Sequence, residues 1–386
     1  MKAANVRVAN VSKRLVLLGA GHAHLHVLAA LQQSPLIGTT TRLVTPCAEV
    51  VYSGMVPGLL AGHYTQNQCS VPLAPLLQAA HLPVTYASCV ALDAQAQTLQ
   101  VAHSGQPGKI ETIAYDLLSI NTGSVMDCDA IDQQIPGAKQ HAVFVRPMAQ
   151  FVQLWPSVLA RAAHQSLQIS VIGAGAGGIE LAMALQHRLP HCQVTLIAGM
   201  AGPGSSYPLV VQRRIAAALA KQRIKVLPNT CIQVAADHLQ LDNSTSVPCD
   251  LALLTIGGHA PAWLANSGLA LDAKGYLATN AYQQSTSHSN VFGAGDVATR
   301  LDTPHPKSGV FAVRAGPVLQ HNLGAALAGR DLMAHRIEPR TLNLISCGSR
   351  TAIASWGPIT AQGQWVWALK NAIDQRWLRR YRVIAL

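Results

Sequence analysis

The sequence predicts an α/β fold with two Rossmann-like dinucleotide-binding domains, the second inserted in the first, followed by a C-terminal α+β segment. Three observations support this prediction. A glycine turn at residues 19–24 lies between an apolar strand and a helix-like stretch, and the same order returns at 173–178. A third glycine turn, at 293–296, follows another apolar strand. Alternating strand and helix patterns favour a parallel sheet that is covered by helices.

The two units repeat the same order of elements. The first has strands over 15–18, 41–44 and 115–120 and a helix over 25–31, while the second has strands over 169–172, 194–197 and 249–256 and a helix over 179–185. A single glycine turn is weak evidence for dinucleotide binding, but two copies in the same context are strong evidence. The strand at 290–292 then returns to the first unit, and this return predicts the insertion.

The first turn has two of the three expected glycines. Gly19 permits the tight turn and Gly21 lets the backbone approach a pyrophosphate at the start of the helix, beside His22. His24 replaces the third glycine, so either the helix and strand pack less closely or its imidazole faces the cofactor. Thr45 stands where such folds usually place a ribose-binding acid, and the nearest acid is Glu49.

The second turn is complete, with Gly173, Gly175 and Gly178. Its second strand is followed by Ala198 and Gly199, without an acid or an arginine, so the sequence does not choose between NADH and NADPH. Glu180 in the adjoining helix either interacts favourably with the helix dipole or lies near the nicotinamide ring.

The third turn contains Asp296, the most informative carboxylate of the chain. Asp296 follows a buried strand and the glycines Gly293 and Gly295. In this position its carboxylate can accept a hydrogen bond from a ribityl hydroxyl. The alternative is an Asx turn that caps the following segment. The terminal strands of the two units end in comparable turns, at Thr122-Gly123 and at Gly257, which we include in the predicted cofactor site.

Composition excludes several classes of protein. Apolar residues make up 49% of the chain and charged residues 12%, which is typical of a globular protein. The net charge of +11 comes from basic residues spread along the chain, without a nucleic-acid-binding motif. The eight cysteines form no C-x-x-C pair. The histidines show no metal-ligand spacing beyond His22, His24 and His26, and alternate positions at a helix start would splay apart, so no metal site is expected. We see no signal peptide or membrane-spanning run and expect a cytoplasmic protein with reduced thiols.

These motifs resemble the FAD-dependent pyridine-nucleotide oxidoreductase superfamily, in the branch of type II NADH dehydrogenases and sulfide:quinone oxidoreductases. Within it the chain is similar to NADH dehydrogenase-like proteins that are often encoded beside, or fused to, selenophosphate synthetase. The stretches that carry this resemblance are 21–24, 52–58, 306–314 and 365–381. The resemblance implies FAD bound by residues 1–142 and 279–330, NAD(P)H bound by 143–278, and a C-terminal segment at 331–386.

The resemblance also implies that electrons pass from NAD(P)H through FAD to a quinone-like acceptor. Lys307 matches a lysine near the flavin in the sulfide:quinone branch and, with Tyr52, is our candidate catalytic residue; a solvated loop lysine is the alternative. A sulfide- or selenium-linked mechanism would use Cys128 and Cys347, although small buried thiols are the favoured interpretation. A flavin-bearing, non-catalytic partner with a decayed nicotinamide site is a third hypothesis.

The C-terminal segment carries an apolar stripe with cations beside it. Large apolar residues recur every four positions between 365 and 382, namely Trp365, Leu369, Ile373, Trp377 and Tyr381. Lys370, Arg376, Arg379, Arg380 and Arg382 are interleaved with them. This pattern predicts a peripheral contact with the cytoplasmic membrane face, where a quinone is available. Packing of the stripe against the protein's own core or a dimer partner is the alternative.

Overall fold

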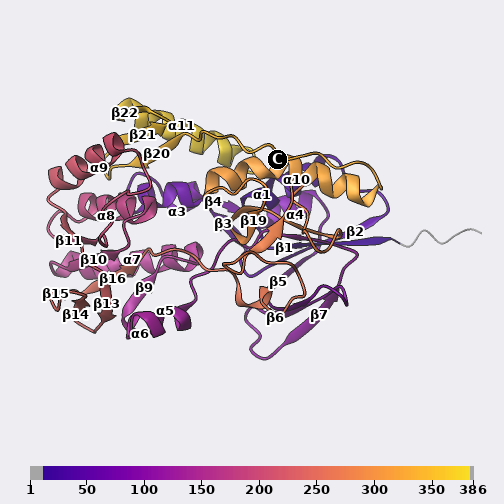
Figure 1. Ribbon diagram of the computed structural model, residues 1–386, viewed down its shortest axis with the longest axis horizontal. Helices are drawn as coiled ribbons and strands as arrows, with labels where there is room; N and C mark the ends of the chain where they lie inside the picture. The colour runs from indigo at the N-terminus through magenta and orange to yellow at the C-terminus, as the bar shows by residue number, and fades with distance from the viewer. Residues whose placement is uncertain (1–11, 383–386) are drawn as a thin grey trace, which may run out of the picture.

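The computed structural model describes residues 12–382, and its two largest sheets lie side by side along the long axis of the molecule (Figure 1). The first has the order β18-β8-β1-β2-β5-β6-β7. Its strands are β1 (Lys13–Leu18), β2 (Thr39–Thr45), β5 (Val84–Asp93), β6 (Thr98–His103), β7 (Ile110–Ala114), β8 (Leu117–Ile120) and β18 (Val291–Gly293). The strands from β18 to β5 are parallel, and β6 and β7 extend them as an antiparallel edge.

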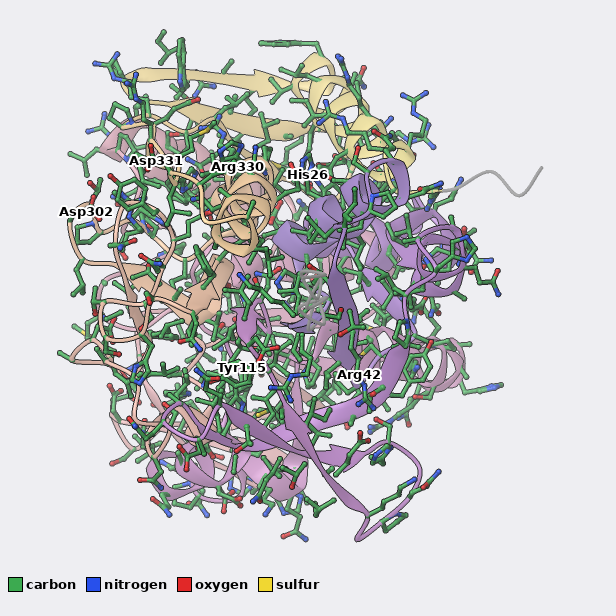
Figure 2. The ribbon with its side chains drawn as sticks, turned by 90° about the vertical axis from the view of Figure 1, so that its right-hand side faces the viewer. His26, Arg42, Tyr115, Asp302, Arg330 and Asp331 are labelled. Atoms are coloured by element: carbon green, nitrogen blue, oxygen red, sulfur yellow. The ribbon has the colours of Figure 1, made fainter. Side chains whose placement is uncertain are left out.

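Two long helices pack together on this first sheet. Helix α1 (His22–Gln33) follows β1, and helix α10 (Gly309–Leu327) follows the last strand of the sheet. The helices approach closely where His26 of α1 meets Gly316 of α10, since a Cβ on Gly316 would lie 2.7 Å from the Cβ of His26. Figure 2 labels His26. The shorter elements of this part are α2 (Val56–Leu60), α3 (Gln66–Cys69), α4 (Leu73–Ala79), and the paired strands β3 (Glu49–Val51) and β4 (Ser70–Pro72).

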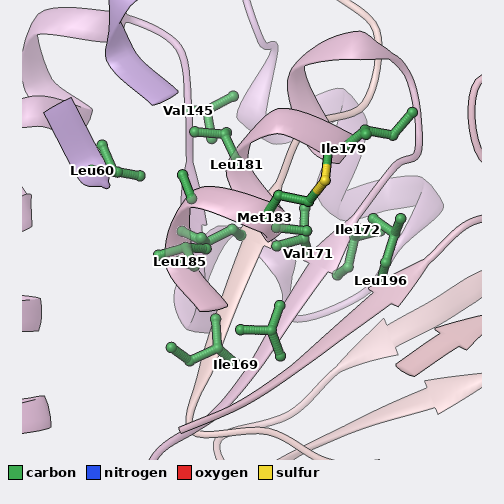
Figure 3. Close-up of a cluster of buried hydrophobic side chains, with 14 of the residues drawn as sticks. Leu60, Val145, Ile169, Val171, Ile172, Ile179, Leu181, Met183, Leu185 and Leu196 are labelled. Carbon is green, nitrogen blue, oxygen red and sulfur yellow. The ribbon is translucent and has the colours of Figure 1, made fainter. Parts of the chain in front are cut away.

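The second sheet is parallel throughout and has the order β12-β11-β10-β16-β9. Its strands are β9 (Ala142–Phe144), β10 (Gln168–Ile172), β11 (Gln193–Ile197), β12 (Lys225–Leu227) and β16 (Leu251–Leu254). Its helices are α7 (Met148–His164), α8 (Ala176–Arg188) and α9 (Leu209–Lys221), and the apolar face of α8 packs onto β10 and β11 (Figure 3). Smaller elements are α5 (Cys128–Gln134), α6 (Ala138–His141), β13 (Cys231–Val234), β14 (His238–Leu241) and β15 (Ser246–Pro248).

The order of the strands confirms the predicted fold class. Strands β8 and β18 are neighbours in the first sheet, while all five strands of the second sheet lie between them in sequence. The second Rossmann-like unit is therefore inserted in the first. The domain boundaries at residues 142, 278 and 330 stay predictions.

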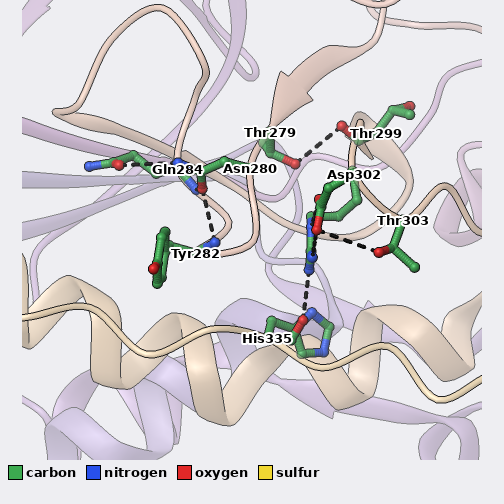
Figure 4. Close-up of polar contacts among 9 residues, drawn as sticks. Thr279, Asn280, Tyr282, Gln284, Thr299, Asp302, Thr303 and His335 are labelled. Atoms are coloured by element: carbon green, nitrogen blue, oxygen red, sulfur yellow. Dashed lines mark hydrogen bonds and ion pairs between the residues drawn. The ribbon is translucent and has the colours of Figure 1, made fainter.

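The last part of the chain is an α+β segment, as predicted. It consists of the antiparallel strands β20 (Asn343–Ser346), β21 (Ala352–Trp356) and β22 (Ile359–Gly363), followed by helix α11 (Gln364–Arg379). The strands β17 (Leu277–Thr279) and β19 (Ala298–Arg300) precede it. Arg300 connects them to the segment: its guanidinium pairs with Asp302 and donates to the carbonyl of His335 at 2.8 Å (Figure 4).

The predicted apolar stripe is only partly correct. Trp365, Leu369 and Ile373 are exposed on α11, but Trp377 and Tyr381 are buried. The reason is geometric, because a step of four residues advances about 40° beyond a full turn, so the stripe rotates by roughly 120° between positions 365 and 377. In residues 12–382 no helix is long and apolar enough to cross a bilayer.

Candidate active site: a flavin cleft and a second dinucleotide turn

A cleft of about 620 Å³ opens at the carboxyl ends of the parallel strands of the first sheet. This is the edge where open α/β sheets bind their ligands. The predicted residues that line it are Gly19, Gly21, His22, Thr45, Thr122, Gly123, Gly295 and Asp296. Glu49, Asn121, Ser124, Arg146 and Trp263 line the same cleft.

The first glycine turn is held by Asn121, which follows β8. The Asn121 side-chain oxygen accepts hydrogen bonds from the amides of Ala23 and His24, both at 3.1 Å. Its Nδ2 donates to the carbonyl of Ala294 at 2.6 Å, so one side chain joins α1, β8 and the third glycine turn. Gly21 is needed for this packing, because a Cβ there would overlap the Asn121 side chain.

His24 does not face the cleft, which corrects its place among the cofactor-binding residues. Its Nδ1 lies against the carbonyl of Gly19 and its Nε2 lies 2.8 Å from the hydroxyl of Ser119 on β8. A carbonyl can only accept, so Nδ1 carries the proton and Nε2 accepts from Ser119. Burial lowers the pKa of His24 to about 4, which keeps the ring neutral. The imidazole thus joins the helix to the sheet.

Arg146, between β9 and α7, places a cation in the cleft beside the third glycine turn. One nitrogen of Arg146, Nη1, donates to the Ser124 hydroxyl at 2.6 Å and lies 3.3 Å from a carboxylate oxygen of Asp296. Gly295 has a φ of +74°, the left-handed region that favours glycine. Gly293 lies in β18 and does not line the cleft; a Cβ there would lie 2.5 Å from the Leu277 side chain. Packing therefore accounts for Gly293.

His22 lies between the cleft and the C-terminal helix. Its ring centroid is 5.5 Å from that of Tyr52 and 5.1 Å from that of Trp377, and Tyr52 stacks on Trp377 at 4.4 Å. Burial lowers the pKa of His22 to about 4. Its Nε2 is buried without a partner among the described residues. An unpartnered polar atom at this position fits a bound polar group, because leaving it unpaired is costly.

Tyr52 is not among the residues that line the cleft. Its hydroxyl donates to Asp374 of α11 at 3.2 Å, and Asp374 pairs with Lys370 at 2.7 Å. Lys370 also donates to the carbonyl of Gly54 at 2.6 Å. Burial raises the pKa of Asp374, and the Lys370 ammonium opposes this shift. A buried ion pair thus attaches α11 to the turn that carries Tyr52.

The second glycine turn has the same backbone but a more open surface. Gly173 has a φ of +109°, and a Cβ on Gly178 would overlap the Gly173 carbonyl oxygen, so both positions require glycine. A Cβ on Gly175 would meet nothing within 4 Å. No described residue accepts a hydrogen bond from the amides of residues 176–178. Unpaired amides at a helix start are suited to a pyrophosphate. Gly257, after β16, also borders open space.

Two other predicted residues lie away from the cavities. Glu180 is in the second turn of α8 rather than the first, and its carboxylate accepts from the amide of Ser346 at 2.7 Å. Burial raises its pKa, with Lys370 opposing the shift. Lys307 does not line the cleft. Its ammonium donates to Ala298 and Thr299 and lies 3.8 Å from the centroid of the Tyr276 ring, and burial lowers its pKa to about 8.

The two candidate redox cysteines are not brought together at the cleft. Neither Cys128 nor Cys347 lines it, and Cys347 instead lines a second cavity between α8, α9 and the C-terminal strands. Burial raises the pKa of both thiols, that of Cys347 to about 12. All eight cysteines are free. A thiol kept protonated is a poor nucleophile, and the two thiols do not meet at the cleft, so their arrangement does not favour sulfide chemistry.

These features define an FAD-dependent oxidoreductase that uses NAD(P)H. The chain belongs to the pyridine nucleotide-disulphide oxidoreductase family, whose profile matches residues 13–316. It is 24% identical over 355 residues to the demethylphylloquinone reductase NdbB of Synechocystis, a match that covers 89% of this chain and 86% of that protein.

Solved structures show the same fold at low sequence identity. NDH2 from Plasmodium falciparum in complex with NADH superposes with a TM-score of 0.80 at 11% identity, over 96% of each chain. The sulfide:quinone oxidoreductase from Aquifex aeolicus superposes with a TM-score of 0.75 at 19% identity, over 96% of this chain and 91% of that one.

Sequence reasoning missed Asn121 and Arg146. Asn121 directly precedes the Thr122-Gly123 turn, so its position at the end of a buried strand was a usable signal. Arg146 lies between β9 and α7 and has no motif of its own.

Proposed function

We propose that this protein transfers electrons from NAD(P)H to a quinone at a membrane surface. Bound FAD supplies the two-electron chemistry that links nicotinamide oxidation to reduction of the acceptor. FAD is proposed to lie along the cleft from Thr45 to Asp296, with the Gly19 and Gly21 backbone at its pyrophosphate. NAD(P)H is proposed to bind at the open turn of Gly173 and Gly175. The alternative of a decayed nicotinamide site is not favoured, since that turn keeps free amides and open space.

One observation carries the proposal for the acceptor. Helix α11 buries Trp377 against His22 and Tyr52 beside the flavin cleft, while its outer face exposes Trp365, Leu369 and Ile373. An apolar acceptor held in a bilayer would therefore reach the protein at the helix that adjoins the cleft. The exposed Arg376, Arg379 and Arg380 continue this surface and would attract anionic lipid, each by roughly 1 kcal/mol.

The test is quinone-dependent oxidation of NADH and NADPH with vesicles that contain anionic lipid and a long-chain quinone. We expect the triple variant Trp365→Ser, Leu369→Ser, Ile373→Ser to keep its bound FAD, to lose flotation with the vesicles, and to turn over this quinone more slowly. A short, water-soluble quinone should be reduced at the wild-type rate. The matched control is Ile110→Ser, an exposed residue of β7 far from α11 (Figure 1). Equal flotation of the triple variant and the wild type would refute the membrane contact, and no reduction of either quinone would refute the acceptor.

A further inference from the structure

The cleft has little positive charge of its own, and the predicted cation Lys307 does not line it. Glu49 and Asp296 line the cleft, and in the described chain Arg146 is the one lysine or arginine that does so. FAD brings two negative charges on its pyrophosphate, and the two amides of Ala23 and His24 at the start of α1 are already used by Asn121. A single cation among these negative charges therefore interacts strongly with a bound anionic cofactor.

The order of strands places Arg146 on one half of the cleft. The pyrophosphate turn follows β1, with β2 and β5 on one side and β8 and β18 on the other. The end of β2 is where such folds bind the adenosine half of a dinucleotide. Arg146 bonds to Ser124, which follows β8, and to Asp296, which follows β18. It therefore belongs to the flavin half.

Arg146 has donors left for a ligand. A guanidinium has five N–H donors, and both bonds to Ser124 and Asp296 use Nη1. Its Nε and Nη2 donate to no residue within 12–382, and its side chain is 38% exposed. Lys307 offers a contrast, because its ammonium is held by the Ala298 carbonyl, the Thr299 hydroxyl and the Tyr276 ring.

We propose that Arg146, and not Lys307, is the residue that stabilises the negative charge of the reduced flavin. Hydride transfer breaks the C4–H bond of the nicotinamide, leaves NAD(P)⁺ and forms an N–H bond on the flavin ring. The ring gains two electrons and one proton, which is one negative charge. The Arg146 guanidinium would favour the reduced form of a flavin bound in this half of the cleft, since fixed positive charge near the ring raises the reduction potential.

The experiment measures the midpoint potential of the bound flavin by equilibrium titration with a reference dye. Arg146→Gln should lower the potential, Arg146→Lys should restore part of it because the charge is kept, and Lys307→Gln should leave it near the wild-type value. Each variant is titrated with saturating FAD, and the dissociation constant of FAD is measured separately. The titration involves neither nicotinamide nor quinone, so its outcome is independent of the proposed acceptor.

Two results would overturn the proposal. One is a wild-type potential in Arg146→Gln saturated with FAD, even if its FAD affinity falls, because that pattern would assign Arg146 to the pyrophosphate. The other is an equal drop in potential in Lys307→Gln, which would return the role to the lysine. If Arg146→Gln does not fold, Arg146→Lys decides, since a shorter cation should still shift the potential measurably.

Discussion

The two glycine turns have the same backbone plan but different neighbours. Asn121 and Thr255 occupy equivalent positions, directly after β8 and β16. The equivalence follows from the strand registers, since Leu18 pairs with Ile120 in the first sheet and Ile172 pairs with Leu254 in the second. Asn121 reaches the amides at the start of α1, whereas the Thr255 hydroxyl donates only to the carbonyls of Ile172 and Gly173. The first turn is therefore closed by a protein side chain, and the second is left open.

This difference matches the tasks that we propose for the two turns, FAD binding at the first and NAD(P)H binding at the second. A cofactor that stays bound through many turnovers benefits from a rigid, preorganised site, whereas a nucleotide that exchanges in every turnover needs free donors and room. The third position of each turn, His24 in the first and Gly178 in the second, also differs in how it joins the helix to the sheet. The His24 ring joins α1 to β8, whereas the absence of a side chain at Gly178 brings α8 directly against the Gly173 carbonyl.

The largest difference between the two turns is expected when the second glycine of each turn is replaced by valine. Gly21→Val should give little folded protein and no bound flavin, because its side chain would overlap Asn121. Gly175→Val should fold and hold FAD, but NAD(P)H should reduce the flavin slower by about 100-fold or more, since the added side chain displaces the pyrophosphate. Flavin content, thermal unfolding and stopped-flow absorbance measure these effects. Flavin loss in Gly175→Val would contradict the division into two sites.

A smaller effect on stability is expected when Asn121, after β8, or Thr255, after β16, is changed. Asn121→Ala removes the acceptor of two buried amides and a donor to the Ala294 carbonyl, so we expect a loss of about 3 kcal/mol in unfolding free energy together with weaker FAD binding. The matched change Thr255→Val removes a hydroxyl donor from two carbonyls and should cost about 1 kcal/mol without affecting FAD. Denaturant unfolding with and without added FAD gives both values. Equal losses in the two variants would show that the Asn121 cap is not special.

These contrasts mark what the sequence could predict. The strands and the turns were predictable because alternating apolar runs and glycines are local signals. The position of Asn121 at the end of a buried strand was also a local signal, but its partner was not, because the amide that it caps belongs to Ala23, 98 residues away. Arg146 has no local signal and lies 150 residues from Asp296. The orientation of Lys307 was equally hidden, since its partners Ala298 and Tyr276 are ordinary residues in sequence. Buried side chains that join distant segments require the fold before their role can be assigned.

The last prediction concerns pH and the position occupied by His24 in one turn and Gly178 in the other. Burial lowers the pKa of His24 from 6.5 to about 4, so the unfolded chain binds more protons than the folded chain between these values. Its neutral form therefore contributes stability that is fully present above pH 6.5 and is lost as the pH falls towards 4. The loss is about 1.4 kcal/mol per pH unit, or roughly 3 kcal/mol in total.

The burial of His22 and His335 lowers their pKa values in the same direction, so the wild type alone cannot isolate His24. His24→Gln supplies the comparison, because it keeps a neutral polar side chain that does not titrate. Its unfolding free energy should fall less steeply than that of the wild type between pH 6.5 and 4. Hydrogen exchange, corrected for intrinsic rates, should show α1 loosening at pH 5 before α8, since Gly178 has no proton to gain. Parallel stability curves for the wild type and His24→Gln would show that the His24 ring does not hold the first turn in its neutral form.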